Sequence, residues 1–173
     1  TNASLDLAIQ AFNNIFNNYL QKVNTNTITF QDQIQKEGMM RYFASLRRIF
    51  ESSPDMLVAC EQILMTHILP ELSSSCGILV ARAVSILGDF CAFKYSNIEI
   101  TKACVNECCN KLKHHELPVK LQASFAIARY IRVEPNSFQY LLPHIELILQ
   151  EFFNLIDVIG NDDVVSSLGS LLD

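Results

Sequence analysis

The residues best suited to chemistry in this chain are Cys104, Cys108, Cys109, His114 and His115, which lie close together in the sequence. Thiolate and imidazole groups bind zinc, and Cys104 and Cys108 share one face of the helix predicted for this segment. His115, however, follows Cys104 by eleven residues, which is about 16 Å along a straight helix. Because zinc bonds are about 2.0–2.3 Å long, one ion would need ligands from another element or a break before His115. The pattern therefore favours core packing, and we predict no metal site and no cofactor.

A Cys–His pair could also supply a nucleophile and its base, but this chemistry needs an oxyanion hole built from suitably placed donors. The chain has only five glycines to form tight backbone turns, and its Ser and Asp residues stand at predicted helix caps. It contains no GxSxG, HExxH or glycine-rich phosphate-binding motif. The sequence therefore predicts that the protein is not an enzyme.

The six cysteines are expected to be free thiols. All but one lie inside apolar helical patterns, where a thiol packs as a small hydrophobic group. A chain of this size does not need disulfides for stability, and scattered cysteines of this kind are typical of a reducing compartment. The cysteines are Cys60, Cys76, Cys91, Cys104, Cys108 and Cys109.

Composition favours a helical protein that binds other proteins. Half of the 173 residues are hydrophobic, whereas glycine and proline occur five times each, which favours helix over strand. The formal net charge of −5 argues against a broad surface for nucleic acid or acidic membrane and suits basic protein partners. No apolar run approaches the roughly 18–20 residues that span a bilayer. The start at Thr1 rather than Met leads us to expect a fragment of a longer protein.

Apolar residues recur at three- and four-residue steps through most of the chain, which predicts a succession of helices. The segment 23–33 is rich in Asn, Thr and Gln and is predicted to be a surface loop. Pro70 and Gly160 are expected to end helices, and Asn161-Asp162-Asp163 to cap a final segment. The predicted helices cover residues 4–20, 37–50, 55–69, 78–93, 98–113, 117–131 and 137–159, with His114-His115-Glu116 as a turn.

The segment 117–131 is predicted to pack closely against a neighbouring helix. Pro118 suits the first turn of a helix, and Ala123 and Ala126 lie on its apolar face, where small residues permit a short interaxial distance. A shift of 40 positions lays Leu79 on Val119 and Ala83 on Ala123. Repeats of about 40 residues that hold two helices are typical of HEAT and armadillo proteins, and no regular place for the third armadillo helix is visible. The sequence thus predicts an all-α solenoid of about four HEAT-like antiparallel helix hairpins, at approximately 3–52, 55–93, 97–132 and 137–173.

Four short blocks, in this order and spacing, carry a family resemblance. They are Gly77–Ala83, Glu116–Lys120 with Ala123 behind it, Tyr140–Pro143 and Asn161–Asp163. Together they resemble the middle of importin-β-type nuclear transport receptors (karyopherins), with most likeness to the importin-seven/importin-eight subgroup. The resemblance covers roughly residues 38–172, and residues 1–37 depart most from it.

The resemblance implies a non-enzymatic receptor that shuttles between cytoplasm and nucleus through nuclear pores. Its partners would be cargo proteins, nucleoporins and the GTPase Ran, whose GTP form releases cargo. In that family the second helix of each hairpin lines the concave surface, which would place segments 78–93 and 117–132 there. The main Ran-binding repeats lie at the family's N-terminal end, which this fragment is expected to lack. A second hypothesis is a HEAT-repeat scaffold subunit of a fixed protein complex.

Six charged residues are candidates for protein contacts, although solvated helix faces or helix caps would place the same residues at the surface. Arg47 and Arg48 are the densest basic pair, but adjacent helical residues point in different directions and form no stripe for phosphates. A segment cut from the middle of a solenoid is also expected to expose apolar faces at its ends and to self-associate. The six candidates are Arg82, Lys120, Arg129, Arg132, Asp162 and Asp163.

Overall fold

The computed structural model describes residues 2–51, 54–160 and Gly169, and over these residues the predicted all-α architecture is confirmed. The predicted cap at Asn161-Asp162-Asp163 lies outside the described residues. None of the helices in the described part of the chain is long and apolar enough to cross a membrane. The α-helices are α1 (Asn2–Asn24), α2 (Phe30–Ser45), α3 (Arg47–Phe50), α4 (Pro54–Ile63), α5 (Gly77–Asp89), α6 (Ile98–Lys111), α7 (Leu117–Val133), α8 (Phe138–Leu141) and α9 (Ile145–Ile159).

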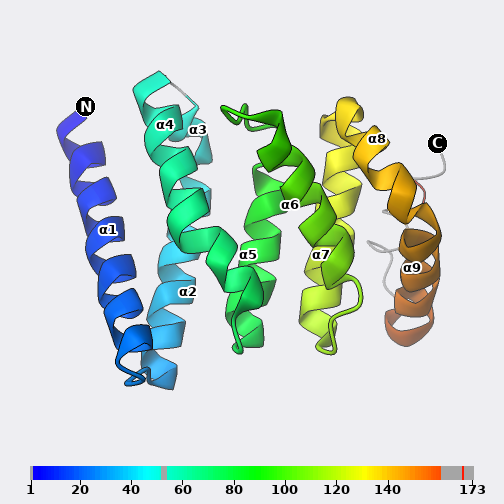
Figure 1. Ribbon diagram of the computed structural model, residues 1–173, viewed down its shortest axis with the longest axis horizontal. Coiled ribbons are helices and arrows are strands. Elements are labelled where there is room, and N and C mark those ends of the chain that lie inside the picture. Colours follow the sequence, from blue (N-terminus) through cyan, green and yellow to red (C-terminus); the bar gives the residue numbers. More distant parts are fainter. Residues whose placement is uncertain (1, 52–53, 161–168, 170–173) are drawn as a thin grey trace.

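The helices pack as antiparallel pairs that form two layers (Figure 1). Helices α1, α4 and α6 lie side by side in the nearer layer, and α2, α5 and α7 lie behind them. Within the second layer α5 packs between α2 and α7. This arrangement is that of a HEAT-like solenoid, in which each hairpin buries its apolar side against its neighbours.

The close approach predicted for α7 occurs against α5. Ala123 and Ala126 are buried, and a Cβ atom added at Gly88 would lie 2.8 Å from the Cα of Ala126. Positions 81–90 and 121–130, which are 40 residues apart, show the same sequence of buried and partly buried side chains. The two helices therefore present equivalent faces to the core.

The N-terminal loop is shorter than the sequence pattern predicted. Instead of ending near residue 20 and resuming at residue 37, α1 continues to Asn24 and α2 begins at Phe30. Thr29 starts α2 through a capping box, because its side chain accepts from the Asp32 N–H and the Asp32 carboxylate accepts from the Thr29 N–H. The Lys22 ammonium group lies 2.5 Å from the same carboxylate, and this hydrogen bond and those from Thr29 lower the pKa of Asp32 to about 2. Polar composition alone thus concealed a helix start.

Replacing Thr29 by alanine is expected to lower the free energy of unfolding by about 0.5–2 kcal/mol, because the first turn of α2 loses its side-chain acceptor. Chemical denaturation followed by circular dichroism measures this loss. Thr27→Ala is the matched control, because Thr27 lies in the same loop and its hydroxyl contacts only that of Thr25 among the side chains described. Equal stability of the two variants would contradict the capping role.

Three predicted helices are interrupted. The predicted helix 37–50 is divided at Leu46 into α2 and α3. The predicted helix 55–69 changes from α4 to a π-helix (Leu64–Ile68), and a 3-10 helix (Leu69–Ser73) continues through Pro70, which was predicted to end the helix. The predicted helix 137–159 is divided into α8 and α9 by a 3-10 turn (Leu142–His144) that contains Pro143, because proline cannot donate to the preceding turn. Gly160 ends α9 with a φ of 58°, in the left-handed region, as the sequence predicted.

The two ends of the described array differ. Among the described side chains of α1, the exposed ones are mostly Asn and Gln, but the apolar Leu7 and Val23 are exposed as well. On α9, Phe153 and Val158 are exposed. Self-association through the ends of the array stays a prediction.

A buried ion pair links the first two helix pairs. The Lys36 ammonium group on α2 lies 2.5 Å from Glu71 Oε1 in the 3-10 helix after α4, and only 1% of the Lys36 side chain is exposed. The same ammonium group lies 4.1 Å from the centroid of the Tyr19 ring on α1. Burial lowers the pKa of Lys36, whereas the bond to Glu71 opposes this effect. A charge, its counter-ion and an aromatic face therefore meet between α1, α2 and the segment after α4.

His67 in the π-helix lies beside this pair, with its ring centroid 4.9 Å from that of Phe16. Burial lowers the pKa of His67 and the positive charge of Lys36 lowers it further, so the unfolded chain binds this proton more readily than the folded chain. Stability should therefore fall as the pH drops below about 6.5, the ordinary value for histidine.

Between pH 7.5 and pH 5.5 we expect His67 to account for a loss of up to about 1.4 kcal/mol in the free energy of unfolding. Urea denaturation at the two pH values measures the loss. The variant His67→Phe keeps a ring against Phe16 but cannot be protonated, so its stability should change less over this range. The same pH dependence in both proteins would show that other groups cause it.

Candidate protein-contact surface

Four of the predicted contact residues lie on two neighbouring helices of the second layer. Arg82 is on α5, whereas Lys120, Arg129 and Arg132 are on α7. Asp162 and Asp163 lie outside the described residues. Whether these residues contact a partner stays a prediction, but the structure shows what each of the four contacts within the chain.

Arg82 connects α5 to α2. Its Nε and Nη2 atoms each lie 2.6 Å from Glu37 Oε1. Arg41, one turn after Glu37 on α2, has its Nη2 atom 3.6 Å from the same oxygen. One carboxylate therefore holds two guanidinium groups from neighbouring helix pairs, and each guanidinium keeps further N–H donors for other acceptors.

Arg129 connects α7 back to α5 through an ion pair with Asp89. Arg47 on α3 donates to the backbone carbonyl of the same Asp89, at the end of α5. Asp89 and Arg129 occupy equivalent positions in the 40-residue repeat. A charged side chain at one position thus pairs with an opposite charge one repeat away.

Lys120 and Arg132 have different surroundings. The Lys120 ammonium group lies 2.9 Å from Glu151 Oε2 and so connects α7 to α9. Arg132 is exposed, and its Nε donates to the carbonyl of Ala128 in its own helix at 3.4 Å. Of the four residues, Arg132 is the one whose contacts stay within a single helix, among the described residues.

The structure adds three arginines to these candidates: Arg47 and Arg48, which the sequence reasoning set aside, and Arg41, which it did not consider. A surface pocket of about 390 Å³ is lined by Arg41, Arg47, Arg48 and Arg82, together with Ala44, Ser45 and Asp89. Although adjacent helical residues were expected to point in different directions, Arg47 and Arg48 both line this pocket, which lies beside the break between α2 and α3 at Leu46. The sequence did contain a signal that Arg41 lies near Arg82, because the two residues are 41 positions apart, which is close to the repeat length.

The cysteines form a core rather than a ligand set. Cys104, Cys108 and Cys109 are buried on α6. Burial raises the pKa of both Cys104 and Cys109 to about 12, which keeps these thiols protonated and weakly nucleophilic at neutral pH. All six cysteines are free, as predicted.

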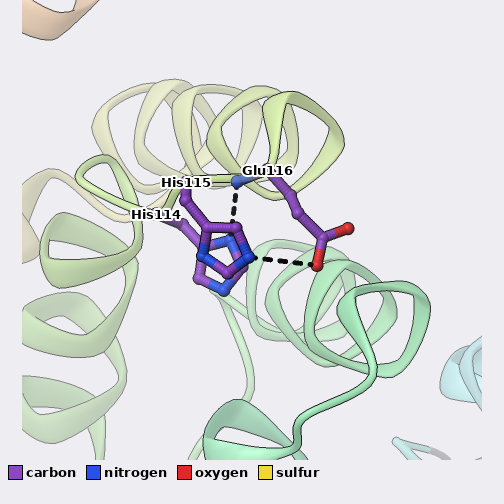
Figure 2. A group of neighbouring side chains, drawn as sticks. All are labelled: His114, His115 and Glu116. Atoms are coloured by element: carbon purple, nitrogen blue, oxygen red, sulfur yellow. Dashed lines mark hydrogen bonds and ion pairs between the residues drawn. The ribbon is translucent and has the colours of Figure 1, made fainter.

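The histidines predicted beside them come together with Glu116 instead (Figure 2). The nitrogen and oxygen atoms that could bind a metal in His114, His115 and Glu116 lie within 4.8 Å of one another. The His114 and His115 rings stack with centroids 4.4 Å apart, and His115 Nε2 lies 3.6 Å from Glu116 Oε1. His114 Nδ1 accepts from the Glu116 N–H at 3.1 Å, which leaves Nε2 as its free ligand atom. Partial burial and the neighbouring His115 lower the pKa of His114.

Imidazole and carboxylate groups are chemically suitable zinc ligands, but these three come from consecutive residues of one turn and His115 is largely exposed. The cysteines do not join them in the one such group found among the described residues. The combined Cys–His site that the spacing raised as an alternative is therefore not formed.

Comparison with known proteins gives matches over most of this chain. Human importin-8 is 28% identical to it over 143 residues, which is 82% of the chain. This chain is similar to importin-8 and to importin-7 homologues. The probable importin-7 homologue of Dictyostelium discoideum is 24% identical over 138 residues, and the importin beta-like SAD2 homologue of Arabidopsis thaliana is 26% identical over 112 residues. The resemblance predicted from the four sequence blocks is thereby confirmed.

The matched region is a small part of these importin relatives. The chain spans 14% of the length of human importin-8 and 13% of the Dictyostelium protein. No protein-family model matches the chain. No solved structure gives a significant match.

Proposed function

We propose that this chain is a protein-binding segment of a nuclear import receptor, which carries cargo through nuclear pores under the control of Ran in its GTP form. The observation that carries the proposal is the similarity to importin-8 over 82% of the chain. The paired helices support it, because a solenoid of this kind offers long helix surfaces to other proteins. The expected partners are cargo proteins, Ran and nucleoporins, and the protein is expected to shuttle between cytoplasm and nucleus and to catalyse no reaction.

The candidate contact residues fit this role in two ways: some of them connect neighbouring helix pairs, and others are exposed and available to a partner. Arg82 and Arg129 connect neighbouring helix pairs through Glu37 and Asp89, and they keep N–H donors beyond these bonds. Arg132 projects from the end of α7. Asp162 and Asp163 stay candidates for contact with basic cargo or with Ran.

A capture experiment tests the proposal. The full-length protein is immobilised and mixed with Ran loaded either with a non-hydrolysable GTP analogue or with GDP. We expect capture of the GTP form and little of the GDP form, together with release of bound cargo proteins when the GTP form is added. Equal or absent capture of the two forms would contradict a Ran-controlled receptor.

The second candidate is a HEAT-repeat scaffold subunit of a fixed complex. The same two-layer helix packing favours it, since this architecture serves binding of any kind. It predicts a partner that co-purifies in constant proportion and is not released by Ran in its GTP form.

A further inference from the structure

The arginines of this chain lie on the second layer, α2, α5 and α7, and on α3, which directly follows α2. All six lie on α2, α3, α5 or α7, and they are Arg41, Arg47, Arg48, Arg82, Arg129 and Arg132. The seven lysines, by contrast, are spread over both layers and the connecting turns. In a chain whose formal net charge is −5, this separation makes one region of the second layer basic.

Four of the arginines line two neighbouring surface pockets. The pocket at the end of α2, lined by Arg41, Arg47, Arg48 and Arg82, shares Arg41 and Arg82 with a second pocket of about 310 Å³. The second pocket extends from α2 across α5 to α7, where Pro118 and Gln122 line it. We call the two pockets together the arginine groove.

The floor and charge of the arginine groove suit an anionic peptide. Ile78, Ala81 and Ala44 contribute apolar groups to the lining. The charged lining consists of four arginines against Glu37 and Asp89, a formal excess of two positive charges. Because Asp89 is also paired with Arg129, part of its charge is already compensated from outside the groove.

Two of the four guanidinium groups, those of Arg47 and Arg82, are held in position by neighbouring groups, and the other two are largely exposed. Arg82 forms an ion pair with Glu37. Arg47 Nε lies 3.5 Å from Glu51 Oε1, and Arg47 Nη1 donates a hydrogen bond to the backbone carbonyl of Asp89. Arg48 is exposed and forms no ion pair within the described residues, and 70% of the Arg41 side chain is exposed. Held guanidinium groups with free N–H donors lose little side-chain freedom when a carboxylate binds, and the pairing can be bidentate.

We propose that the arginine groove binds an acidic peptide segment of a partner protein through its Asp and Glu carboxylates. The acidic segment would belong to one of the partners expected under the proposed function. That the partner is a cargo protein or a regulator rests on the proposed function. The span from α3 to α7 across neighbouring helices is about 16–20 Å, which matches about five or six extended residues. The two acidic residues in the lining disfavour the higher charge of phosphate groups, and they make the groove a poor track for a nucleic-acid backbone.

Fluorescence anisotropy with a labelled hexaglutamate peptide tests the proposal on the 173-residue chain, with hexaglutamine and hexalysine as reference peptides. We expect saturable binding of hexaglutamate that weakens at high salt, and no binding of the two references. The double variant Arg41→Gln/Arg48→Gln should weaken the binding by about tenfold or more, because it removes two charge-assisted contacts. Both arginines are exposed, so the variant should keep the parental circular dichroism spectrum.

The charge-matched control is Lys102→Gln/Lys113→Gln. It changes the net charge equally, at exposed residues outside the groove, and should change the affinity for hexaglutamate by less than about twofold. Equal weakening in both double variants, or no binding of hexaglutamate to the parent, would overturn the proposal. If inorganic phosphate displaces hexaglutamate and acetate does not, the site does not select carboxylates. Binding of a single-stranded oligoribonucleotide more tightly than hexaglutamate would also overturn the choice of carboxylates. Failure here with intact capture of Ran in its GTP form would remove this site and leave the proposed function standing.

Discussion

Replacing Lys36 by methionine is expected to lower the free energy of unfolding by about 3–5 kcal/mol, because it leaves the buried Glu71 carboxylate without its counter-ion. Methionine approximates the shape of the lysine stem, so the loss reports mainly on the charge. The variant also loses the contact of the ammonium group with the Tyr19 ring. The expected cost is a large share of the stability of an ordinary domain.

The double variant Lys36→Met/Glu71→Met is expected to recover most of this loss. A buried ion pair gains Coulomb energy but also costs desolvation of both charges, and apolar replacement of the whole pair is often neutral or stabilising. The difference between the double variant and the sum of the single variants measures the coupling between the two residues.

Lys22→Met is the matched control, because it also removes a lysine that lies 2.5 Å from a carboxylate, that of Asp32. Because the Lys22 side chain is 39% exposed, water can take its place beside the Asp32 carboxylate. We therefore expect this variant to lower the free energy of unfolding by less than about 1 kcal/mol. Urea denaturation of the parent protein, the two single variants Lys36→Met and Glu71→Met, their double variant and Lys22→Met gives the comparison. Similar small losses for Lys36→Met and Lys22→Met would show that Glu71 finds another partner or takes up a proton.

Much of the helix order could be predicted from the sequence, because apolar periodicity and caps are local. The helix predicted over residues 98–113 does begin at residue 98, where the Asn97 side chain accepts from the Glu99 N–H, and Gly160 ends α9 as predicted. The start of α2 was missed because Thr29 stands among polar residues that are typical of loops. The capping box of Thr29 and Asp32 would have indicated this helix start better than the polar composition of the segment did.

The ion pairs could not be predicted in the same way, because they depend on how helix pairs dock. Lys36 and Glu71 are 35 positions apart and belong to different helix pairs, and no local pattern marks them as partners. Arg82 and Arg129 were predicted at the surface, and each also pairs with an acid of a neighbouring helix. The 40-residue offset could have indicated one such pair, since it aligns Asp89 with Arg129.

Gly88 gives the sharpest test of the packing between α5 and α7. A Cβ atom there would lie 2.8 Å from Ala126 Cα and 2.9 Å from Ala126 Cβ, closer than packed carbon atoms approach each other. The Ala126 backbone belongs to a buried helix that cannot rotate away. Gly88→Ala is therefore expected to lower the free energy of unfolding by about 1–3 kcal/mol, although alanine favours helix by about 0.5–1 kcal/mol.

Gly38→Ala separates the steric effect from helix propensity. Gly38 also lies within a helix, α2, but a Cβ atom there would meet nothing within 4 Å, so this variant should gain about 0.5–1 kcal/mol. The double variant Gly88→Ala/Ala126→Gly restores the space on the facing helix and should be more stable than the sum of its single changes predicts. Thermal and urea denaturation of these variants measure the opposite signs expected at the two glycines. If Gly88→Ala gains stability as Gly38→Ala does, there is room for a Cβ atom at position 88, and α5 and α7 are farther apart there than the 2.8 Å distance to Ala126 Cα indicates. The shared face of the two helices would then have to be reassigned.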